Sequence, residues 1–350
     1  MAETAFPPLT QTVKKGGCAA KLPAGQLRGF LGRLSEKFPH RPKELLVGTE
    51  NLDDAALWDL GNGQLLIQTL DFFTPIVDSP KDFGAIAAAN AISDVYAMGG
   101  KPATALTILA FPASTLPLEM VEPLMEGAQE VIAESGAVLA GGHSIDDETL
   151  KLGFSVSGFV SKDRAWTNAG AKPGDRLILT KGLGTGTITT ALKNGDAPKE
   201  AIDAAIASMK KLNQAPELLS GITVHAATDI TGFGLAGHSM QVAQASRVAI
   251  EFDWAKIPSL TWALDSIREE NLNRAHKTNA DYTAKGVDFS KCDPAYRWLA
   301  LDPQTSGGLL LSVAEKDADE VVERLKSRFP QTAVIGKVVE KKADHWVAFI

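Results

Sequence analysis

Apolar residues recur at helical spacing in two stretches of the first third of the chain. Residues 26–38 predict an amphipathic helix, because their apolar side chains fall on one face. These side chains are Leu27, Phe30, Leu31, Leu34 and Phe38. Residues 82–98 are rich in alanine and are followed by Gly99-Gly100, a common way for a helix to end. Both stretches are therefore predicted to be helices.

Apolar runs of strand length predict a sheet in the rest of the first half. Residues 55–60 and 64–70 flank Gly61-Asn62-Gly63, which has the composition of a hairpin turn. A helix is predicted over residues 117–135. The other predicted strands of this half cover residues 104–111, 137–140 and 152–160.

Strands and helices also alternate in the second half, which predicts layered α/β domains throughout. The predicted strands are 176–180, 224–228, 248–252, 308–313, 333–339 and 345–350, and the predicted helices are 185–194, 199–221, 235–245 and 317–328. Residues 271–296 are polar and are expected to form a loop. Turn-forming residues in 166–175 place a domain boundary there. We expect a mobile glycine-rich segment (1–24) and two domains (25–165 and 166–350).

Composition narrows the possible classes of protein. The chain has 350 residues and a net charge of −7, with its basic residues scattered, which argues against a nucleic-acid partner. Its two cysteines, Cys18 and Cys292, lie far apart and indicate a reducing compartment. The most apolar stretch, residues 83–111, is interrupted by an acid, two glycines and a proline, so no membrane span is expected. Without a signal-peptide pattern, the chain is expected to be cytoplasmic.

Four acids lie at the ends of predicted elements or on an apolar helix face. They are Asp54 of the pair Asp53-Asp54, Asp71, Asp94 and Asp229. Asp94 shares a helix face with Asn90, and an acid among small apolar side chains is costly without a partner such as a metal ion. Hard cations such as Mg²⁺ prefer carboxylate oxygens and are often shared with phosphates. The set indicates a nucleotide–Mg²⁺ site, although Asp53-Asp54 alone is also typical of a solvated turn.

Several glycine-rich segments resemble phosphate-binding loops. Residues 232–237 fit the dinucleotide pattern G-x-G-x-x-G, but Asp229 just before them would repel a pyrophosphate, so hydride transfer is disfavoured. Residues 182–186 are better explained as a tight turn. Residues 141–144 follow a short strand and are either a phosphate cradle or a turn. Residues 302–308 precede a very apolar strand as a shaped loop, and neither a P-loop nor a zinc motif occurs.

The segment Gly16-Gly17-Cys18-Ala19-Ala20-Lys21 carries a candidate reactive group. A cysteine with little side-chain cover beside a cation forms an accessible thiolate more readily than a buried one. Cys18 is therefore a candidate nucleophile or ligand. An exposed thiol in a frayed terminus is the alternative.

Together these motifs resemble those of the selenophosphate synthetase (selenide, water dikinase) family, over nearly the whole chain. The segments that carry the resemblance are residues 17–21, 53–56, 69–73, 90–94, 98–102, 140–144, 228–234 and 302–308. The acidic, glycine and His-Ser elements are similar, more loosely, to those of all ATP enzymes related to aminoimidazole-ribonucleotide synthetase. The pair Cys18 and Lys21 narrows the resemblance to the selenium enzymes.

The resemblance implies a two-domain α/β fold, with N-terminal sheets paired in a homodimer and a C-terminal α/β sandwich. It implies that ATP, selenide and water give selenophosphate, AMP and orthophosphate, which supplies activated selenium for selenoprotein and selenonucleoside synthesis. The implied cofactor is Mg²⁺, with a monovalent cation such as K⁺ as a further candidate. A selenium-delivery protein is a candidate partner.

Matching positions imply a role for each site residue. Cys18 would handle selenium and Lys21 would contact the ATP phosphates. The implied metal ligands are Asp54, Asp94 and Asp229. The implied nucleotide-binding residues are Lys21, Asn51, Leu52, Asp53, Asp71, Asp94, Gly142, His143 and Ser144, of which the last three reach across the dimer.

One position departs from the family pattern. Many relatives have a second cysteine where this chain has Ala20, so a mechanism that needs two neighbouring thiols does not fit. Cys292 matches no motif and is expected to be incidental. Two alternatives stay open at this point: another ATP enzyme of the same fold, such as a purine-pathway ligase or thiamine-monophosphate kinase, and a non-catalytic protein that binds nucleotide or metal.

Overall fold

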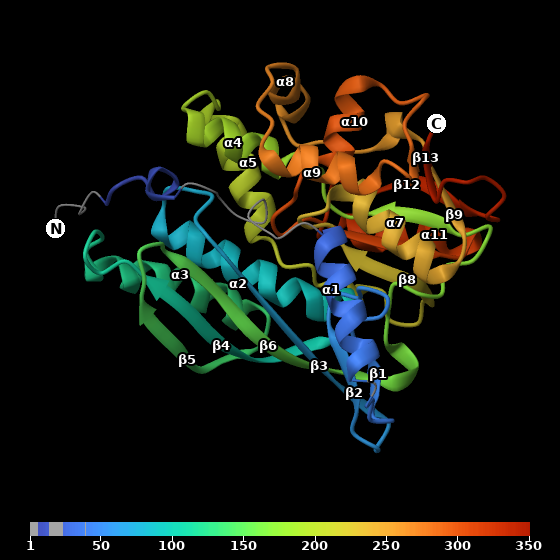
Figure 1. Cartoon of the computed structure of the whole chain (residues 1–350), viewed down its shortest axis with the longest axis horizontal. Coiled ribbons are helices and arrows are strands. Elements are labelled where there is room, and N and C mark those ends of the chain that lie inside the picture. Colours follow the sequence, from blue (N-terminus) through green and yellow to red (C-terminus); the bar gives the residue numbers. More distant parts are fainter. Residues whose placement is uncertain (1–5, 14–23, 39) are drawn as a thin grey trace.

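The computed structural model describes residues 6–13, 24–38 and 40–350. In this part of the chain, helices pack on two sheets that follow each other along the sequence (Figure 1). The first sheet has six strands and the second has seven. The predicted α/β fold with two sheets is confirmed.

The first sheet is mostly antiparallel. Its strand order is β1 (Leu45–Val47), β2 (Ala56–Asp59), β3 (Gln64–Phe73), β6 (Lys151–Ser161), β4 (Lys101–Phe111) and β5 (Val138–Asp146). Only the β4–β5 pair is parallel. The predicted hairpin at residues 61–63 is confirmed, because β2 and β3 pair on either side of it.

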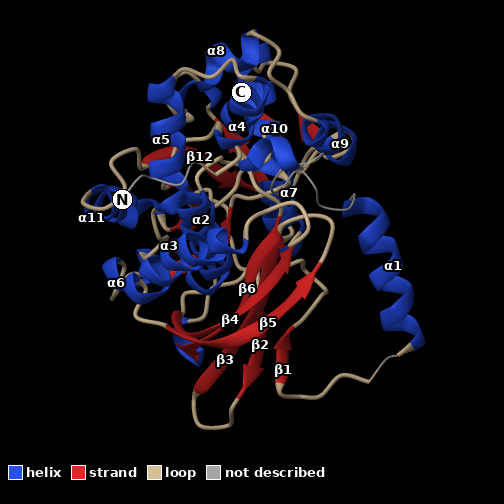
Figure 2. Cartoon of the chain, turned by 90° about the vertical axis from the view of Figure 1, so that its left-hand side faces the viewer, coloured by secondary structure: helices blue, strands red, loops and turns tan. Residues whose placement is uncertain are grey.

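Two helices, α2 (Pro80–Ala97) and α3 (Val121–Glu134), lie on one face of the first sheet (Figure 2). Glycines allow their backbones to touch, since a Cβ on Gly84 would lie 1.8 Å from the carbonyl oxygen of Leu124. All residues of α2 from Phe83 onward are buried, which fits its uniformly small and apolar sequence. This buried part of α2 therefore carries its polar side chains, Asn90, Ser93 and Asp94, into the interior.

The predicted amphipathic helix near residues 26–38 is present as α1 (Ala24–Lys37). Figure 2 shows α1 standing beside the first sheet and apart from α2 and α3. Phe30 and the adjoining Phe38 are more than half exposed, so their apolar surface is not covered by the described part of this chain.

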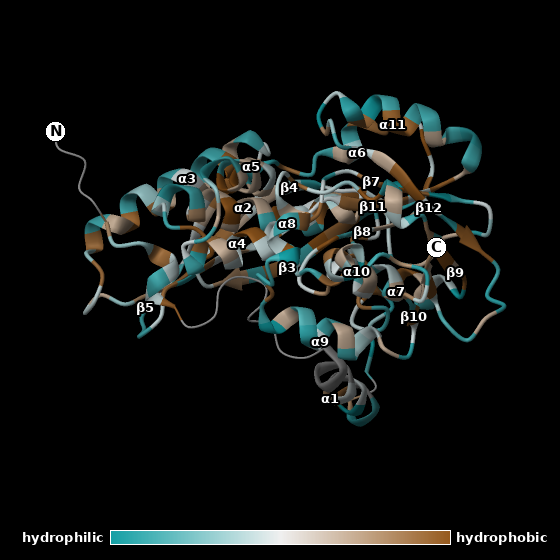
Figure 3. Cartoon of the chain, turned by 90° about the horizontal axis from the view of Figure 1, so that it is seen from above, coloured by the Kyte–Doolittle hydropathy of each residue, from teal (hydrophilic) through white to brown (hydrophobic). Residues whose placement is uncertain are grey.

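The second sheet lies between two groups of helices (Figure 3). Its strand order is β10 (Val287–Asp288), β13 (Val347–Phe349), β9 (Ala249–Phe252), β12 (Ala333–Val339), β7 (Arg176–Leu179), β11 (Leu309–Val313) and β8 (Val224–Asp229). On one side lie α6 (Ala215–Leu218) and α11 (Ala318–Lys326), and on the other α7 (Gly234–Ser246), α9 (Arg274–Thr283) and α10 (Pro294–Leu301).

Three further helices and five 3-10 turns complete the described part. The helices are α4 (Thr185–Asn194), α5 (Lys199–Lys210) and α8 (Ala263–Arg268), and α5 packs against α2. The 3-10 turns are Leu9–Thr12, Leu118–Met120, Lys162–Arg164, Trp254–Lys256 and Glu315–Asp317.

Three sequence predictions of local structure are wrong. The predicted helix over residues 199–221 is divided into α5 and α6, with residues 211–214 between them not helical. Residues 271–296 are not a loop but contain α9, β10 and the start of α10. Helix α9 begins with a capping box between Asn273 and His276, and its polar Asn279 is buried, so apolar periodicity does not mark it. Residues 141–144 are not a loop after a short strand either, because they continue β5 to Asp146.

The glycine pattern at residues 232–237 does not belong to a dinucleotide-binding unit. It joins β8 to α7, but β8 and the next strand, β9, are separated in the sheet by β11, β7 and β12. A dinucleotide-binding βαβ unit uses neighbouring parallel strands. The structure thus agrees with the prediction that this motif does not mark a dinucleotide-binding site.

Candidate metal and nucleotide site

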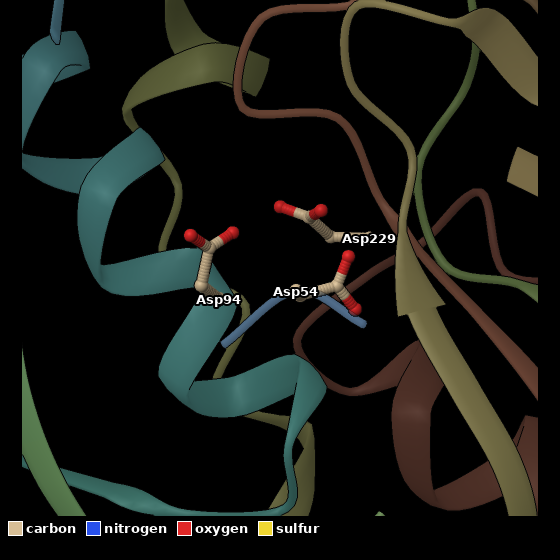
Figure 4. Close-up of side chains that lie close together, drawn as sticks. All are labelled: Asp54, Asp94 and Asp229. Atoms are coloured by element: carbon tan, nitrogen blue, oxygen red, sulfur yellow. The ribbon is translucent and has the colours of Figure 1, made fainter. Parts of the chain in front are cut away.

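Three carboxylates meet where the two sheet-containing parts of the chain face each other (Figure 4). Asp54 precedes β2, Asp94 lies on the buried helix α2, and Asp229 is the last residue of β8. One oxygen from each lies within 4.8 Å of the others. The structure thus brings together the three residues that the sequence analysis predicted as metal ligands.

Hydroxyl groups hold each of these carboxylates in place. Thr69 Oγ1 donates a hydrogen bond to Asp94 Oδ2 at 2.5 Å. Ser93 Oγ donates to Asp229 Oδ2 at 2.6 Å.

The third carboxylate is only half satisfied. Thr228 Oγ1 donates to Asp54 Oδ1 at 3.0 Å. The other oxygen of Asp54, Oδ2, is inaccessible to solvent and has no hydrogen-bond partner among the described residues. A buried acceptor of this kind is costly unless something outside the described chain binds it.

Burial and the nearness of other acids shift the titration of Asp54 and Asp94. Burial, reinforced by the charge of Asp229, raises the pKa of Asp54 and of Asp94 well above the ordinary value. The charges of Asp71 and Asp54 raise the pKa of Asp94 further. Three carboxylates with one unsatisfied oxygen form a donor set that fits a hard divalent cation, which would remove their mutual repulsion.

Asp71 belongs to the same neighbourhood through Asn90. Asn90 Nδ2 donates to Asp71 Oδ2 at 2.7 Å, and Asn90 Oδ1 accepts the backbone N–H of Ser306 at 2.8 Å. Asp71 lies on β3 and Asn90 on α2, so their contact joins the first sheet to its covering helix. Ser306 comes from the loop before β11, which ties this pair to the second half of the chain.

The segment 51–53 is held by one asparagine, Asn168, which lies between β6 and β7. The N–H of Asn168 donates to Asp53 Oδ1 at 2.7 Å, and Asn168 Nδ2 donates to the carbonyl oxygens of Leu52 at 2.9 Å and Asn51 at 3.3 Å. Leu52 has a left-handed backbone with φ of 54°. Burial raises the pKa of Asp53. Asp53 therefore fixes the loop that presents Asp54, and its part in nucleotide binding stays a prediction.

Gly142, His143 and Ser144 are not part of the acidic cluster. They lie on β5, at the edge of the first sheet, and pair with β4 on one side only. All three are exposed. A Cβ on Gly142 would lie 2.3 Å from the carbonyl oxygen of Thr107, so this position requires glycine. Their predicted contact with nucleotide stays a prediction.

The glycine loop at residues 182–186 has its amides occupied by side chains. The N–H groups of Gly184 and Thr185 donate to Gln304 Oε1 at 3.1 and 3.2 Å. The N–H of Gly186 donates to Asp302 Oδ2 at 3.0 Å. The turn interpretation therefore holds, and the loop at residues 302–308 caps α4.

Sequence reasoning missed one buried lysine near the cluster. Lys181 follows β7 and is 3% exposed, and its Nζ donates to the carbonyl oxygens of Lys211 at 2.6 Å and Ser306 at 2.9 Å. Burial lowers the pKa of Lys181 to about 7. The one signal in the sequence is a lysine placed directly after an apolar strand.

The predicted catalytic residues Cys18 and Lys21 lie outside the described residues. Cys292 is partly buried, and burial raises the pKa of its thiol to about 12, so it is a poor nucleophile near neutral pH. Among the described helices, none has the length and apolarity needed to cross a membrane.

Family models match both halves of the chain. The model of the AIR synthase related protein N-terminal domain matches residues 52–160, and that of the C-terminal domain matches residues 172–347. Asp54 and Asp94 fall in the first match and Asp229 in the second. The chain thus has both domains of an AIR synthase related protein, and the acidic cluster draws residues from each.

Curated relatives show to which family of AIR synthase related proteins the chain belongs. The chain is 50% identical to the selenide, water dikinase of Bdellovibrio bacteriovorus, over 95% of this chain and 96% of the relative. It is 49% identical to that of Nitrosomonas eutropha, over 97% and 98%. The chain belongs to the selenide, water dikinase family.

Solved structures share the fold at much lower identity. Thiamine-monophosphate kinase from Stenotrophomonas maltophilia is 20% identical with a TM-score of 0.65, covering 91% of this chain and 95% of that one. Hydrogenase maturation protein HypE in complex with ATP is 18% identical with a TM-score of 0.63, covering 89% and 86%. At this distance they show the fold alone.

Proposed function

We propose that this chain is the enzyme that makes selenophosphate from selenide, ATP and water, with release of AMP and orthophosphate. The observation that carries the proposal is the cluster of Asp54, Asp94 and Asp229 in a chain about half identical to selenide, water dikinases. The thiamine-monophosphate kinase alternative is not favoured, because its likeness lies near 20% identity.

The acidic cluster is the proposed Mg²⁺ site. Asp54, Asp94 and Asp229 would hold the ion, and Asp54 Oδ2 would gain the partner that it lacks. When bound, Mg²⁺ supplies positive charge that offsets the charge of the nucleotide phosphates. Asp71 lies beside the cluster and is proposed, with residues 51–53, to line the nucleotide site. A monovalent cation such as K⁺ is a further candidate cofactor.

Cys18 and Lys21 are the proposed catalytic residues. Phosphoryl transfer depends mainly on positioning and on neutralising charge, so a positive charge at the transferred phosphoryl group favours it. Lys21 supplies that charge in our proposal. Selenide is already a strong nucleophile, and Cys18 therefore serves to capture or deliver it. Ala20 leaves Cys18 to act as a single thiol.

The outer face of the first sheet is the proposed homodimer interface. Alternate residues of its strands expose large apolar side chains on the face away from α2: Trp58, Leu70, Phe72, Leu106 and Phe159. A contiguous apolar face of this kind marks an interaction site. The exposed edge strand β5 would then bring His143 and Ser144 toward the partner's nucleotide. The proposed location is the cytoplasm, with a selenium-delivery protein as a further partner.

Phosphorus NMR under anaerobic conditions tests the function. With ATP, Mg²⁺ and selenide, we expect a phosphate signal coupled to selenium, together with AMP. The Cys18→Ser variant should bind ATP but form no selenide-dependent AMP, whereas Cys292→Ser should behave as wild type. Release of ADP without a selenium-coupled signal would instead favour an ordinary kinase of the same fold.

A further inference from the structure

Lys181 is a buried lysine whose two acceptors are both backbone carbonyls. Lys181 Nζ donates to the carbonyl oxygens of Lys211 and Ser306 at 2.6 and 2.9 Å, which a lysine amine does in either protonation state. The lowered pKa of about 7 agrees with an amine held in this way. Burying a lysine is costly, and a methionine would fill the same space. The contacts therefore point to a need for this cross-link.

The two cross-linked segments also meet each other. Asn213, two residues after Lys211, donates through Nδ2 to the carbonyl oxygen of Gly307 at 2.7 Å. The side chain of Asn213 is 1% exposed. Ser306 has a left-handed backbone with φ of 47°, a conformation that surrounding contacts must maintain. Lys181 thus completes a small buried hydrogen-bond network that joins residues 211–213 to residues 306–307.

Two chains of hydrogen bonds lead from this buried network to Asp71 and Asp229. In the first, the N–H of Ser306 reaches Asn90, which donates to Asp71. In the second, Asn213 Nδ2 donates to Ser93 Oγ at 2.8 Å, and Ser93 Oγ donates to Asp229 Oδ2 at 2.6 Å. Each chain is continuous and ends on an acid of the candidate site.

We propose that Lys181 is a positioning residue, which cross-links residues 211 and 306 so that Ser93 and Asn90 hold Asp229 and Asp71 ready for metal and nucleotide. The proposal deepens the proposed function and rests on it. Groups that orient the ligands of a metal affect its affinity without touching it. The role assigned to Lys181 does not depend on its charge.

Direct binding tests the proposal without relying on turnover. Calorimetry with MgATP and thermal unfolding without ligand would be measured on wild type, Lys181→Met and Lys181→Gln. We expect Lys181→Met to weaken metal-dependent binding by about tenfold or more, as for other residues that orient metal ligands. Lys181→Gln keeps an N–H donor and should lose less. Lys211→Met is the matched control, because the Lys211 side chain is exposed and donates to the carbonyl oxygen of Arg328 instead.

A double-mutant cycle separates positioning from general stability. If Lys181 acts through Ser93, then Ser93→Ala should weaken Mg²⁺ binding much less in the Lys181→Met background than in wild type. Steady-state assays should show a higher half-saturating Mg²⁺ concentration with a smaller change in kcat. Wild-type Mg²⁺ affinity in folded Lys181→Met, or fully additive effects with Ser93→Ala, would overturn the proposal. If wild type itself does not bind Mg²⁺, that result would instead refute the proposed metal site.

Discussion

Replacing Asp54 by asparagine should stabilise the metal-free protein while removing its response to Mg²⁺. The Asp54→Asn change keeps the shape of the side chain and removes one of three charges. Asp54 Oδ1 accepts from Thr228, and an amide oxygen can still accept there. The main effect of the substitution is therefore electrostatic.

The size of the effect follows from the geometry of the cluster. The three oxygens lie within 4.8 Å of one another. At that separation and an effective dielectric constant of about 20, two full charges repel by about 3 kcal/mol. The acids already relieve part of this by retaining protons, so we expect Asp54→Asn to raise the free energy of unfolding by about 2 kcal/mol. This corresponds to a rise in apparent Tm of about 4–8 °C for a domain of this size.

The pH dependence has a definite sign. The pKa values of Asp54 and Asp94 are raised in the folded protein above the ordinary 3.8. Between 3.8 and the raised values, the folded protein binds more protons than the unfolded chain, so stability falls as pH rises. The cost is complete above the raised pKa values. The advantage of Asp54→Asn should therefore grow with pH and vanish toward about pH 4.

Thermal unfolding of chelator-treated protein, followed by circular dichroism with and without Mg²⁺, measures both effects. Wild type should gain stability on addition of Mg²⁺, whereas Asp54→Asn should gain little. Asp163→Asn, at an exposed position, is the control and should match wild type. The reasoning fails if Mg²⁺ raises the Tm of Asp54→Asn as much as that of wild type. It also fails if the metal-free variant melts below wild type.

Three shorter predictions concern the rest of the molecule. Phe72→Glu, on the exposed sheet face, should shift the sedimentation coefficient from dimer to monomer, and an unchanged dimer would place the interface elsewhere. Gly84→Ala should lower stability in thermal unfolding by about 1–3 kcal/mol, because its Cβ would overlap the carbonyl oxygen of Leu124. The thiol of Cys292, with a pKa of about 12, should react slowly with a thiol reagent at pH 8, and fast labelling would contradict its burial.

Much of the fold follows from local sequence signals because the apolar pattern and the packing agree. Helix α2 is an example, since its alanine-rich run is buried on all sides. Helix α9 shows where this reasoning fails. Its buried Asn279 donates to the carbonyl oxygens of Gly232 and Leu301, so a polar residue does the packing that an apolar one usually does. A helix whose buried face carries polar side chains lacks the apolar periodicity that predicts a helix.

The residues of the candidate site also differ in whether the sequence alone predicts them. Asp94 and Asp229 are visible in the sequence, because an acid on an apolar helix or at the end of an apolar strand needs a partner. Lys181 is not, because its acceptors are backbone carbonyls 30 and 125 residues away in the chain. Backbone carbonyls carry no sequence signature, so only the folded structure identifies such a contact. The edge position of His143 likewise depends on the full length of β5.

The acidic cluster is formed by residues from both parts of the chain, so a bound cation would join the two parts. Asp54 and Asp94 come from the part matched by the N-terminal family model, and Asp229 comes from the part matched by the C-terminal one. Without a cation, the carboxylates repel across this junction. A cation bound by all three converts the repulsion into an attraction that joins the two parts. Because binding to the folded state alone adds stability, Mg²⁺ should raise the cooperativity of unfolding between the two parts as well as the Tm.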